Sequence, residues 1–599
     1  MSEIRNDAEE GWWRTPLLQQ IAPLQNRENQ IFLLLTLAIG ALTGLAVVAF
    51  ILLTERLGIR LYPASGAAWR RVLIPIGGSL GIGYLLYRYF PDARGSGVPQ
   101  TKAALFARDG VITLGTVLGK FFCTSVTLAS GIPLGREGPA VQVGGGIASV
   151  LGRRLGLGPE KVKALLPAGA SAAIAAAFNT PLAAVLFALE EVMGDLNAPV
   201  LGSVVIASAT SWVVLRLILG NNPLFNVPQY RLIHPLELIV YAVLGVVGGL
   251  VSVAFTKLLL GMRKRFLQFP EKSLWVQPVV GGLLVGLMGW FVPQVLGVGY
   301  GYVGDALNGR MTLTLMALLV ILKLLGASTS YASGNAGGIF GPSLFIGAML
   351  GGTVGSIAHR LLPTYTATPG AYALVGMGTA FAGIVRAPMT SVLMIFETTR
   401  DYTVIVPLMI SNLVSFFISS RLQRQPIYTA LAFQDGIHLP TAEIRQRHRQ
   451  YQVSQAMRPS AEVLPAHMPI IEALERISSS TTRAWPVIDR RGVIGVVSFA
   501  AIERLCSEGA AAKLLGDLMN AKTFPHVHSD QPLDLALERL GAAGLDVLPV
   551  VSRANVNKLE GVVTLGDLLA AFGIDVAAQR GFTKGLSAER DVALESHRT

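Results

Sequence analysis

The sequence has few charged residues and very few cysteines. Charged residues make up 14% of the 599 residues, well below the quarter that is usual in soluble domains. The two cysteines, Cys123 and Cys506, lie far apart, so no disulfide framework is expected. None of the eight histidines belongs to an HExxH pattern, which argues against a membrane metalloprotease. No GxxxxGK[ST] sequence is present, which argues against a pump with a phosphate loop.

Apolar sequence dominates the first 420 residues. Hydrophobic residues make up 52% of the chain, and the mean hydropathy is +0.53. A run of about 20 apolar residues can span a bilayer, whereas the shorter runs here are broken by Gly or Pro. Unwound backbone at membrane depth is tolerated only where protein or water covers it. We therefore predict a polytopic helical membrane protein with cavities. The clearest runs are 31–53, 201–219, 239–260, 311–325 and 404–420.

The formal net charge of +12 does not indicate a nucleic-acid partner, because cytoplasmic Lys and Arg of a membrane protein account for such an excess. Residues 1–30 are too polar for a secretory signal peptide, so we expect a cytosolic N-terminus. The apolar residues at 12, 13, 17 and 18 fit a short amphipathic helix or a disordered tail, and the sequence does not decide between them.

The apolar region contains an internal duplication. The sequence FNTPLAAVLFALEE at 178–191 resembles VRAPMTSVLMIFETT at 385–399, with Pro181 and Pro388 207 residues apart. Upstream, residues 138–152 resemble residues 341–355 at a spacing of 203. Duplicated halves with broken helices that meet near the midplane are typical of transporters. The sequence leaves open whether the halves are inverted.

The C-terminal region contains a second, shorter duplication. ALER at 473–476 recurs at 536–539, and WPV at 485–487 recurs as LPV at 548–550, both 63 residues apart. Each copy reads as a helix, a strand, a turn, a second strand and a helix. We predict a small soluble α/β domain built of two copies.

Three Gly- and Pro-containing stretches each precede or open an apolar helix: GSGVP (95–99), GREGP (135–139) and GIFGP (338–342). Helix N-termini expose free N–H groups and carry a partial positive charge, so several such ends form an anion site without a lysine. The alternative is a set of Gly-rich packing contacts. A divalent-cation transporter would need several carboxylates in its pore, and the apolar region contains few acids.

These three stretches, in this order, closely resemble the CLC family of chloride channels and proton-coupled chloride transporters. The resemblance covers about residues 30–432 and includes GKFF (119–122) and PIYTAL (426–431), while the tail resembles a paired CBS module. It implies an all-α membrane domain of two repeat-related halves with broken helices, followed by a small α/β CBS pair. It also implies a homodimer with one anion pathway in each subunit.

The resemblance assigns a role to each matching position. Ser96 and Tyr428 would offer hydroxyls to a central anion, and Ile339 and Phe340 would offer backbone N–H groups. Glu137 would be the external gate and proton acceptor, because its carboxylate can occupy the place meant for chloride. The alternative, a salt bridge from Glu137 to Arg136, is disfavoured because adjacent helical residues do not face each other.

Glu191 matches the internal proton-transfer glutamate of the family's antiporters, a position that is usually apolar in channels. Its alternative is a solvated acid at a helix end. Glu190 is expected to be structural because Glu397 occupies the corresponding position in the second half, and Lys120 is expected to have a structural or electrostatic role. We therefore predict exchange of chloride for protons; the alternative is a passive voltage-gated chloride channel.

The tail sequence TLGD fits the CBS pattern in which Thr564 and Asp567 hold a ribose. The first copy has SFAA at 498–501, without the acid. The resemblance therefore allows an adenine nucleotide to bind asymmetrically, in the second copy alone; the alternative is a purely structural module that supports the dimer. No metal site, no other cofactor and no enzymatic activity are expected.

The predicted organisation has six parts, in a bacterial inner membrane protein with both termini in the cytosol. They are an N-terminal segment (1–30), the membrane domain (31–432), a linker (433–452), two CBS repeats (453–510 and 511–575) and a polar tail (576–599).

Overall fold

In a computed structural model, the chain forms two compact units, of which the first ends at Leu439. The structure describes residues 16–571, and side chains from Gln30 on, with short gaps. The gaps are 64–65, 197–199, 221–223, 226, 229, 231, 401, 438, 440–450, 460–461, 479, 481 and 520–523. Most of the predicted linker, the polar tail and both N-terminal tryptophans lie outside the described residues.

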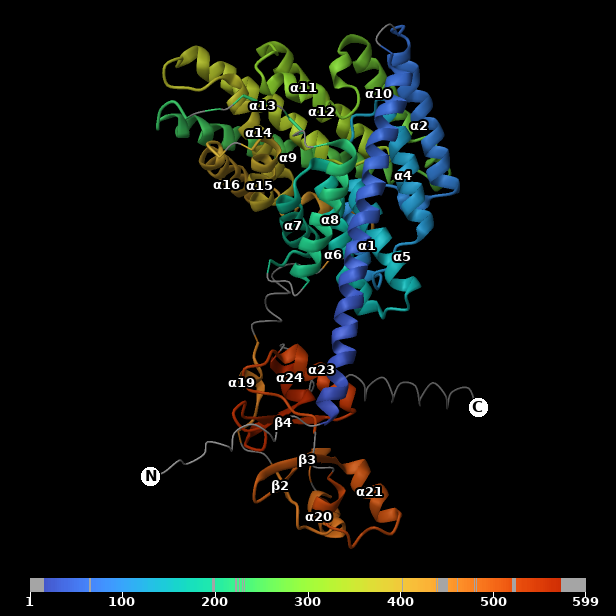
Figure 1. The fold of residues 1–599 in the computed structure, drawn as a ribbon, viewed down its shortest axis with the longest axis vertical. Helices are drawn as coiled ribbons and strands as arrows, with labels where there is room; N and C mark the ends of the chain where they lie inside the picture. Colours follow the sequence, from blue (N-terminus) through green and yellow to red (C-terminus); the bar gives the residue numbers. More distant parts are fainter. Residues whose placement is uncertain are drawn as a thin grey trace, which may run out of the picture. The chain divides into compact units, whose positions relative to one another are not determined.

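The named elements of the first unit are all helices in its described part, and they form two consecutive sets (Figure 1). The first helix begins at Pro16, inside the predicted N-terminal segment. The first set comprises α1 (Pro16–Leu61), α2 (Arg70–Arg88), η1 (Pro91–Ala93), α3 (Val98–Ala107), α4 (Leu114–Ala129), α5 (Glu137–Arg154), α6 (Pro159–Phe178), α7 (Pro181–Phe187), η2 (Ala188–Met193) and α8 (Leu201–Leu219).

The second set repeats this order. It comprises α9 (Glu237–Phe266), η3 (Glu271–Ser273), α10 (Pro278–Phe291), η4 (Pro293–Val295), α11 (Tyr300–Leu307), α12 (Leu313–Ala332), α13 (Phe340–Leu361), α14 (Pro369–Val385), α15 (Pro388–Thr399), α16 (Ile405–Leu422) and α17 (Ile427–Gln434). The short helices α3 and α11 start 202 residues apart, α5 and α13 start 203 apart, and α7 and α15 start 207 apart. The predicted duplication is thus a duplication of helices.

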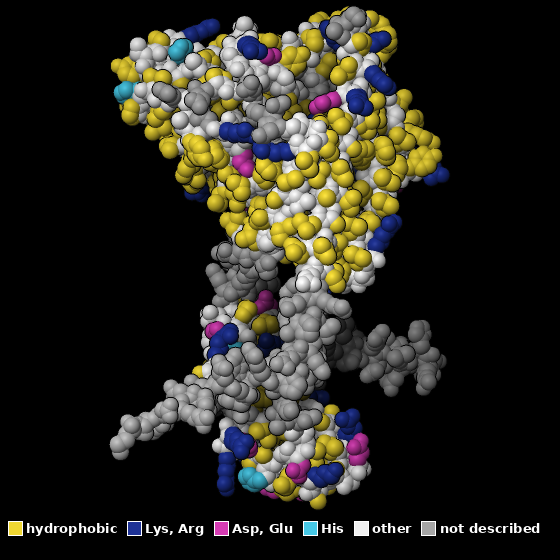
Figure 2. All heavy atoms as spheres, in the orientation of Figure 1, with side chains coloured by type: hydrophobic (Ala, Val, Ile, Leu, Met, Phe, Trp, Pro, Cys, Tyr) yellow, Lys and Arg dark blue, Asp and Glu magenta, His cyan; other side chains and the backbone are white. Residues whose placement is uncertain are grey.

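Helix boundaries follow from local sequence. Pro181 and Pro388 stand in the first turns of α7 and α15, where proline costs no hydrogen bond. The residues that follow α6 and α14, Asn179 and Arg386, are both left-handed, so each helix stops and the chain turns before the next one. Seven helical segments among the described residues are long and apolar enough to cross a membrane. Hydrophobic side chains cover much of the visible flank of this unit (Figure 2).

The two halves are inverted relative to each other. The repeat mates α2 and α10 lie side by side and antiparallel: Gly286 packs against Val72, Gly282 against Pro75, and Gly83 against Trp275, which lies just before α10. In each pair the two backbones are so close that a Cβ on the glycine would clash. The structure thus decides the question that the sequence left open.

The second unit contains two α/β copies, as predicted. The first has α19 (Val453–Ala456), β1 (Leu464–Pro465), α20 (Ile470–Ile477), β2 (Ala484–Asp489), β3 (Gly492–Ser498) and α21 (Phe499–Ser507), with β1 parallel and β3 antiparallel to β2. The second has α22 (Leu515–Leu518), α23 (Leu533–Ala543), β4 (Val547–Val551), β5 (Leu559–Thr564) and α24 (Leu565–Ala571), with β4 antiparallel to β5.

Candidate functional site

The Gly-rich loops before α3, α5 and α13 meet inside the first unit. Gly135 and Gly338 exchange two backbone hydrogen bonds of 2.7 Å each, so the loops of the two halves form a short antiparallel bridge. A Cβ on Gly97 would lie 2.2 Å from the Gly138 carbonyl oxygen, and only glycine permits this approach. The first turns of three helices from both halves therefore converge, as the anion-site prediction requires.

Two buried lysines hold the loops that lead into α3 and α11. The Lys120 ammonium donates to the carbonyls of Ala93 (2.9 Å) and Gly95 (2.6 Å). Its repeat mate Lys323 does the same at the carbonyls of Val295 and Gly297. Lys120 thereby fixes the residue that precedes Ser96, which is the structural role expected for it.

Ser96 and Tyr428 face each other from the loop before α3 and the first turn of α17. Both residues are fully buried, and neither hydroxyl has a partner of ordinary hydrogen-bond geometry among the described residues. Ile339 and Phe340 occupy the N-terminal cap and first position of α13, where backbone N–H groups lack intrahelical partners. The Phe340 ring packs between aromatic rings of the core, which fixes the start of α13.

Glu137 is the first residue of α5, and its side chain is fully buried. Its Oε2 atom lies against Gly341 in the first turn of α13, close to the backbone N–H of that residue. The Glu137 carboxylate therefore lies at the N-terminal end of a helix of the opposite half. The ion pair of Arg136 is with Glu55 (3.8 Å).

Tyr300 is a residue of this site that the sequence interpretation missed. It is the first residue of α11, and its hydroxyl donates a hydrogen bond to Glu137 Oε1. A signal was present: GVGYG at 297–301 repeats the spacing of GSGVP at 95–99, 202 residues later. Extending the duplication by one motif would have identified a fourth Gly-rich helix start.

Glu191 is buried and forms an ion pair with Lys102 of α3, with 2.7 Å between Nζ and Oε1. It lies in the π-helical turn η2. The alternative of a solvated acid at a helix end is therefore wrong. Lys102 was not anticipated as its partner, since the two residues are 89 positions apart.

The neighbouring Glu190 caps a helix of the other half. Its carboxylate accepts from the backbone N–H and the hydroxyl of Thr390 (2.8 and 2.7 Å) at the start of α15. Reciprocally, Glu397 accepts from the N–H groups of Leu182 and Ala183 at the start of α7. The two caps are equivalent under the internal repeat. The contacts of Glu190 are therefore those of a structural residue, as expected.

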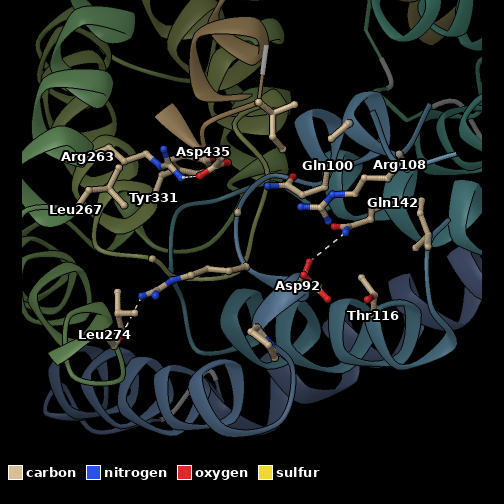
Figure 3. A pocket seen from close by; sticks show the side chains of 18 of the residues that line it. Asp92, Gln100, Arg108, Thr116, Gln142, Arg263, Leu267, Leu274, Tyr331 and Asp435 are labelled. Atoms are coloured by element: carbon tan, nitrogen blue, oxygen red, sulfur yellow. Dashed lines mark hydrogen bonds and ion pairs between the residues drawn. The ribbon is translucent and has the colours of Figure 1, made fainter. Parts of the chain in front are cut away.

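Two basic pockets lie at opposite ends of α2 and α10. The first, of about 540 Å³, includes Gly95, next to Ser96, and Gly334. Figure 3 shows Arg108, Gln100 and Gln142 on one side of it, opposite the ion-paired Arg263 and Asp435. The second, of about 410 Å³, includes the repeat mates of these glycines, Gly297 and Gly131, together with Arg70 and Arg71.

Because α2 has 19 residues, its ends are about 28 Å apart, close to the thickness of a bilayer core. The two pockets, at opposite ends of this helix, are therefore separated by about the thickness of a bilayer core. Their arginines raise the local concentration of anions.

In the second unit, Asp567 is fully engaged by the protein. Its Oδ2 accepts from the N–H and hydroxyl of Thr564 (3.1 and 2.7 Å), which caps α24. Its Oδ1 accepts two bonds from the Arg458 guanidinium (2.9 and 2.6 Å). A ribose at this carboxylate would compete with Arg458. No cluster of His, Cys, Asp and Glu among the described residues could hold a metal ion.

Comparisons with known proteins agree with this architecture. Residues 77–420 match the family model of the voltage gated chloride channel, and residues 453–507 and 515–573 match the CBS domain. The chain is 33% identical over 370 residues to the H(+)/Cl(-) exchange transporter ClcA of Vibrio campbellii, covering 61% of this chain and 79% of that protein. It is 34% identical over 357 residues to ClcA of Vibrio parahaemolyticus, covering 58% and 76%.

Solved structures show the same fold. A slow cyanobacterial Cl-/H+ antiporter matches with a TM-score of 0.63 and 27% identity, over 67% of this chain and 97% of that one. A eukaryotic CLC transporter matches with a TM-score of 0.58 and 21% identity, over 90% and 97%. This protein therefore belongs to the CLC family and carries a pair of CBS domains C-terminal to its membrane domain.

Proposed function

We propose that this protein exchanges chloride for protons across a membrane, with the Glu137 carboxylate competing with chloride for one site. The observation that carries the proposal is the burial of this carboxylate against the first turn of α13, where helix N-termini of both halves meet. Such a place favours negative charge. When Glu137 takes up a proton, it loses that attraction and a chloride ion can replace it.

The anion path runs from one basic pocket to the other. Ser96 and Tyr428 donate their hydroxyls to a central chloride, and Ile339 and Phe340 donate their backbone N–H groups. The hydroxyls of Ser96 and Tyr428 are fully buried and face each other, which supports this assignment because both can donate to one anion. Hydroxyls and amides bind chloride without the full charge that would hold it too tightly.

Glu191 transfers protons on the internal side. Its burial and its ion pair with Lys102 support this role, because they hold a second carboxylate inside the membrane domain. The Lys102 ammonium is the counter-ion of this carboxylate inside the protein. A passive channel needs no such second carboxylate, and the similarity to exchange transporters favours the exchanger.

The CBS pair binds an adenine nucleotide through Thr564 and Asp567. The carboxylate and hydroxyl needed for a ribose are adjacent in the structure, and the first copy has Ser498 with no acid at the corresponding place. Binding would displace Arg458 from Asp567. Titration calorimetry with AMP and ATP, on wild type and Asp567→Asn, tests this assignment; equal heats for the two proteins contradict it.

The protein works as a homodimer in a bacterial inner membrane, with both termini in the cytosol. Helices α7, α8, α15 and α16 carry exposed apolar side chains, and we expect this surface to pack against the same surface of a second subunit. They include Leu182, Val205, Val213, Leu217, Met389, Met409, Leu413 and Phe417. A cysteine at Leu413 should crosslink between subunits in membranes, whereas a cysteine at the exposed Leu80 of α2 should not.

Proton uptake by liposomes tests the exchange directly. Liposomes with purified protein are loaded with high chloride, placed in low chloride at equal pH, and held at zero voltage with valinomycin and equal potassium. Passive leak then has no driving force, so an exchanger alone moves protons inward as chloride leaves. We expect uptake with the wild type and none with Glu137→Gln, which still passes chloride. Chloride efflux without proton movement in the wild type contradicts the proposal.

A further inference from the structure

A phenol from the second half of the membrane domain holds the gating carboxylate of the first half. Tyr300 begins α11, and its hydroxyl donates to Glu137 Oε1 across the repeat interface. Gly299, at φ +85°, turns the chain into this helix, and a Cβ there would lie 2.6 Å from the Phe345 ring. The backbone is thus built to present Tyr300 to the buried carboxylate.

The Tyr300 ring is fixed on two sides. The Arg136 guanidinium lies over it at 5.6 Å from its centroid, and Phe225 meets it edge-on at 5.8 Å. Arg136 is in turn paired with Glu55. These contacts involve the ring and not the hydroxyl, so Tyr300→Phe removes the hydrogen bond while the packing stays.

A hydrogen bond from a phenol to a carboxylate is charge-assisted and stabilises the ionised form. We propose that Tyr300 is a positioning residue that holds charged Glu137 in its buried place and thereby sets the pH at which chloride transport turns on. This inference rests on the proposed function, in which protonation of Glu137 admits chloride. Tyr300 would thus influence the protonation of Glu137 although it lies outside the Gly-rich motif that contains Glu137.

The other charged or titratable groups near Glu137 are Arg136, the N-terminal cap of its own helix, and Tyr428 of α17. Arg136 also favours the charged carboxylate, and Tyr428 remains neutral at the pH values of the assay. Neither changes in Tyr300→Phe. Loss of the phenol therefore makes Glu137 easier to protonate, so the transport profile moves to higher pH.

Chloride efflux from liposomes, measured from pH 4 to pH 8, tests this role. A hydrogen bond to a charged group is worth enough to move a titration midpoint by about one pH unit. We expect the efflux midpoint of Tyr300→Phe about one unit above that of the wild type, with equal rates at pH 4. In the Glu137→Gln background, Tyr300→Phe should not change the pH dependence of chloride efflux.

Tyr230→Phe is the matched control, because the Tyr230 hydroxyl donates to the carbonyl of Leu307 at the other end of α11. The substitution removes a hydrogen bond from a phenol to the same helix, α11, and leaves the contacts of Glu137 in place. We expect it to change the efflux rate by the same factor at every pH and to leave the efflux midpoint unchanged.

Two results would overturn the inference in distinguishable ways. If wild-type efflux depends on pH but Tyr300→Phe keeps its midpoint, as Tyr230→Phe does, Tyr300 is only structural and the exchange mechanism stands. If wild-type efflux does not depend on pH, or if Glu137→Gln still moves protons, the proposed function fails and the role of Tyr300 fails with it.

Discussion

The two halves of the membrane domain agree where they build the scaffold. Lys120 and Lys323 each hold the loop that enters a short helix. Glu190 and Glu397 each cap a helix of the opposite half. These residues occupy corresponding positions and make corresponding contacts, as a two-fold architecture requires.

The halves differ at the residues that we propose for transport. Glu137 corresponds to Phe340, 203 residues later, and Glu191 corresponds to Thr398, 207 residues later. Ser96 corresponds to Val298 at the spacing of 202. A duplicated scaffold thus carries a single set of polar groups at its centre. The comparison teaches that the residues we propose for transport lie where the halves have diverged, and that the contacts of the scaffold lie where they agree.

The lysines should give the largest effect on stability, and the same effect in both halves. Lys120→Met leaves two buried carbonyls without a donor, at about 1–3 kcal/mol each, and so does Lys323→Met. We expect each variant to lower the free energy of unfolding in mixed micelles by about 4 kcal/mol. If only one of the two variants were destabilised, the two lysines would not have equivalent roles.

The ion pair of Glu191 should give the next largest effect, and it has no counterpart in the second half, where Gly304 stands 202 residues after Lys102. Lys102→Met leaves a buried carboxylate without its counter-ion, which costs about 3 kcal/mol. The double variant Lys102→Met/Glu191→Gln should recover stability to within about 1 kcal/mol of the wild type. Equal unfolding free energies of the single and double variants would show that the two side chains are not coupled.

The carboxylate caps should give a smaller and again symmetric effect. Glu190→Gln and Glu397→Gln keep the shape of the side chain but lose the charge at a helix N-terminus, which costs about 1 kcal/mol. Thermal unfolding in detergent should show two similar decreases in the melting midpoint. A change confined to Glu190→Gln would indicate a function for Glu190 beyond capping.

The smallest effect is expected in the second unit, at the ion pair of Arg458 and Asp567. The Arg458 side chain is 63% exposed while that of Asp567 is 13% exposed, so water screens the guanidinium, and surface ion pairs contribute about 0–1 kcal/mol. Arg458→Ala should therefore change the unfolding free energy by less than about 1 kcal/mol, far less than Lys102→Met. A loss as large as that of Lys102→Met would show that this exposed pair holds the CBS fold together.

The sequence alone predicted the features that are local or periodic. Apolar runs predicted the helices, Gly and Pro predicted where the helices start, and repeated motifs predicted the duplicated architecture. Family resemblance then pointed to Glu137 and Glu191. Each of these signals lies within a few neighbouring residues or recurs at a fixed spacing.

Contacts between distant segments could not be predicted. Tyr300 and Glu137 are 163 positions apart, and nothing near either residue specifies the other. The inversion of the halves likewise depends on how α2 packs against α10. The engagement of Asp567 by Arg458 is a third case, since the TLGD motif indicates a ligand site but not the guanidinium that occupies its carboxylate.

The most direct test compares the adjacent carboxylates Glu190 and Glu191, of which the first is shared by both halves and the second is not. The measurement is the number of protons moved per chloride in liposomes, together with the melting midpoint in detergent. Our account predicts that Glu191→Gln stops proton movement while chloride still flows, and that Glu190→Gln keeps the wild-type ratio but melts at a lower temperature. The account would be contradicted if Glu191→Gln kept the wild-type number of protons per chloride, or if Glu190→Gln no longer moved protons.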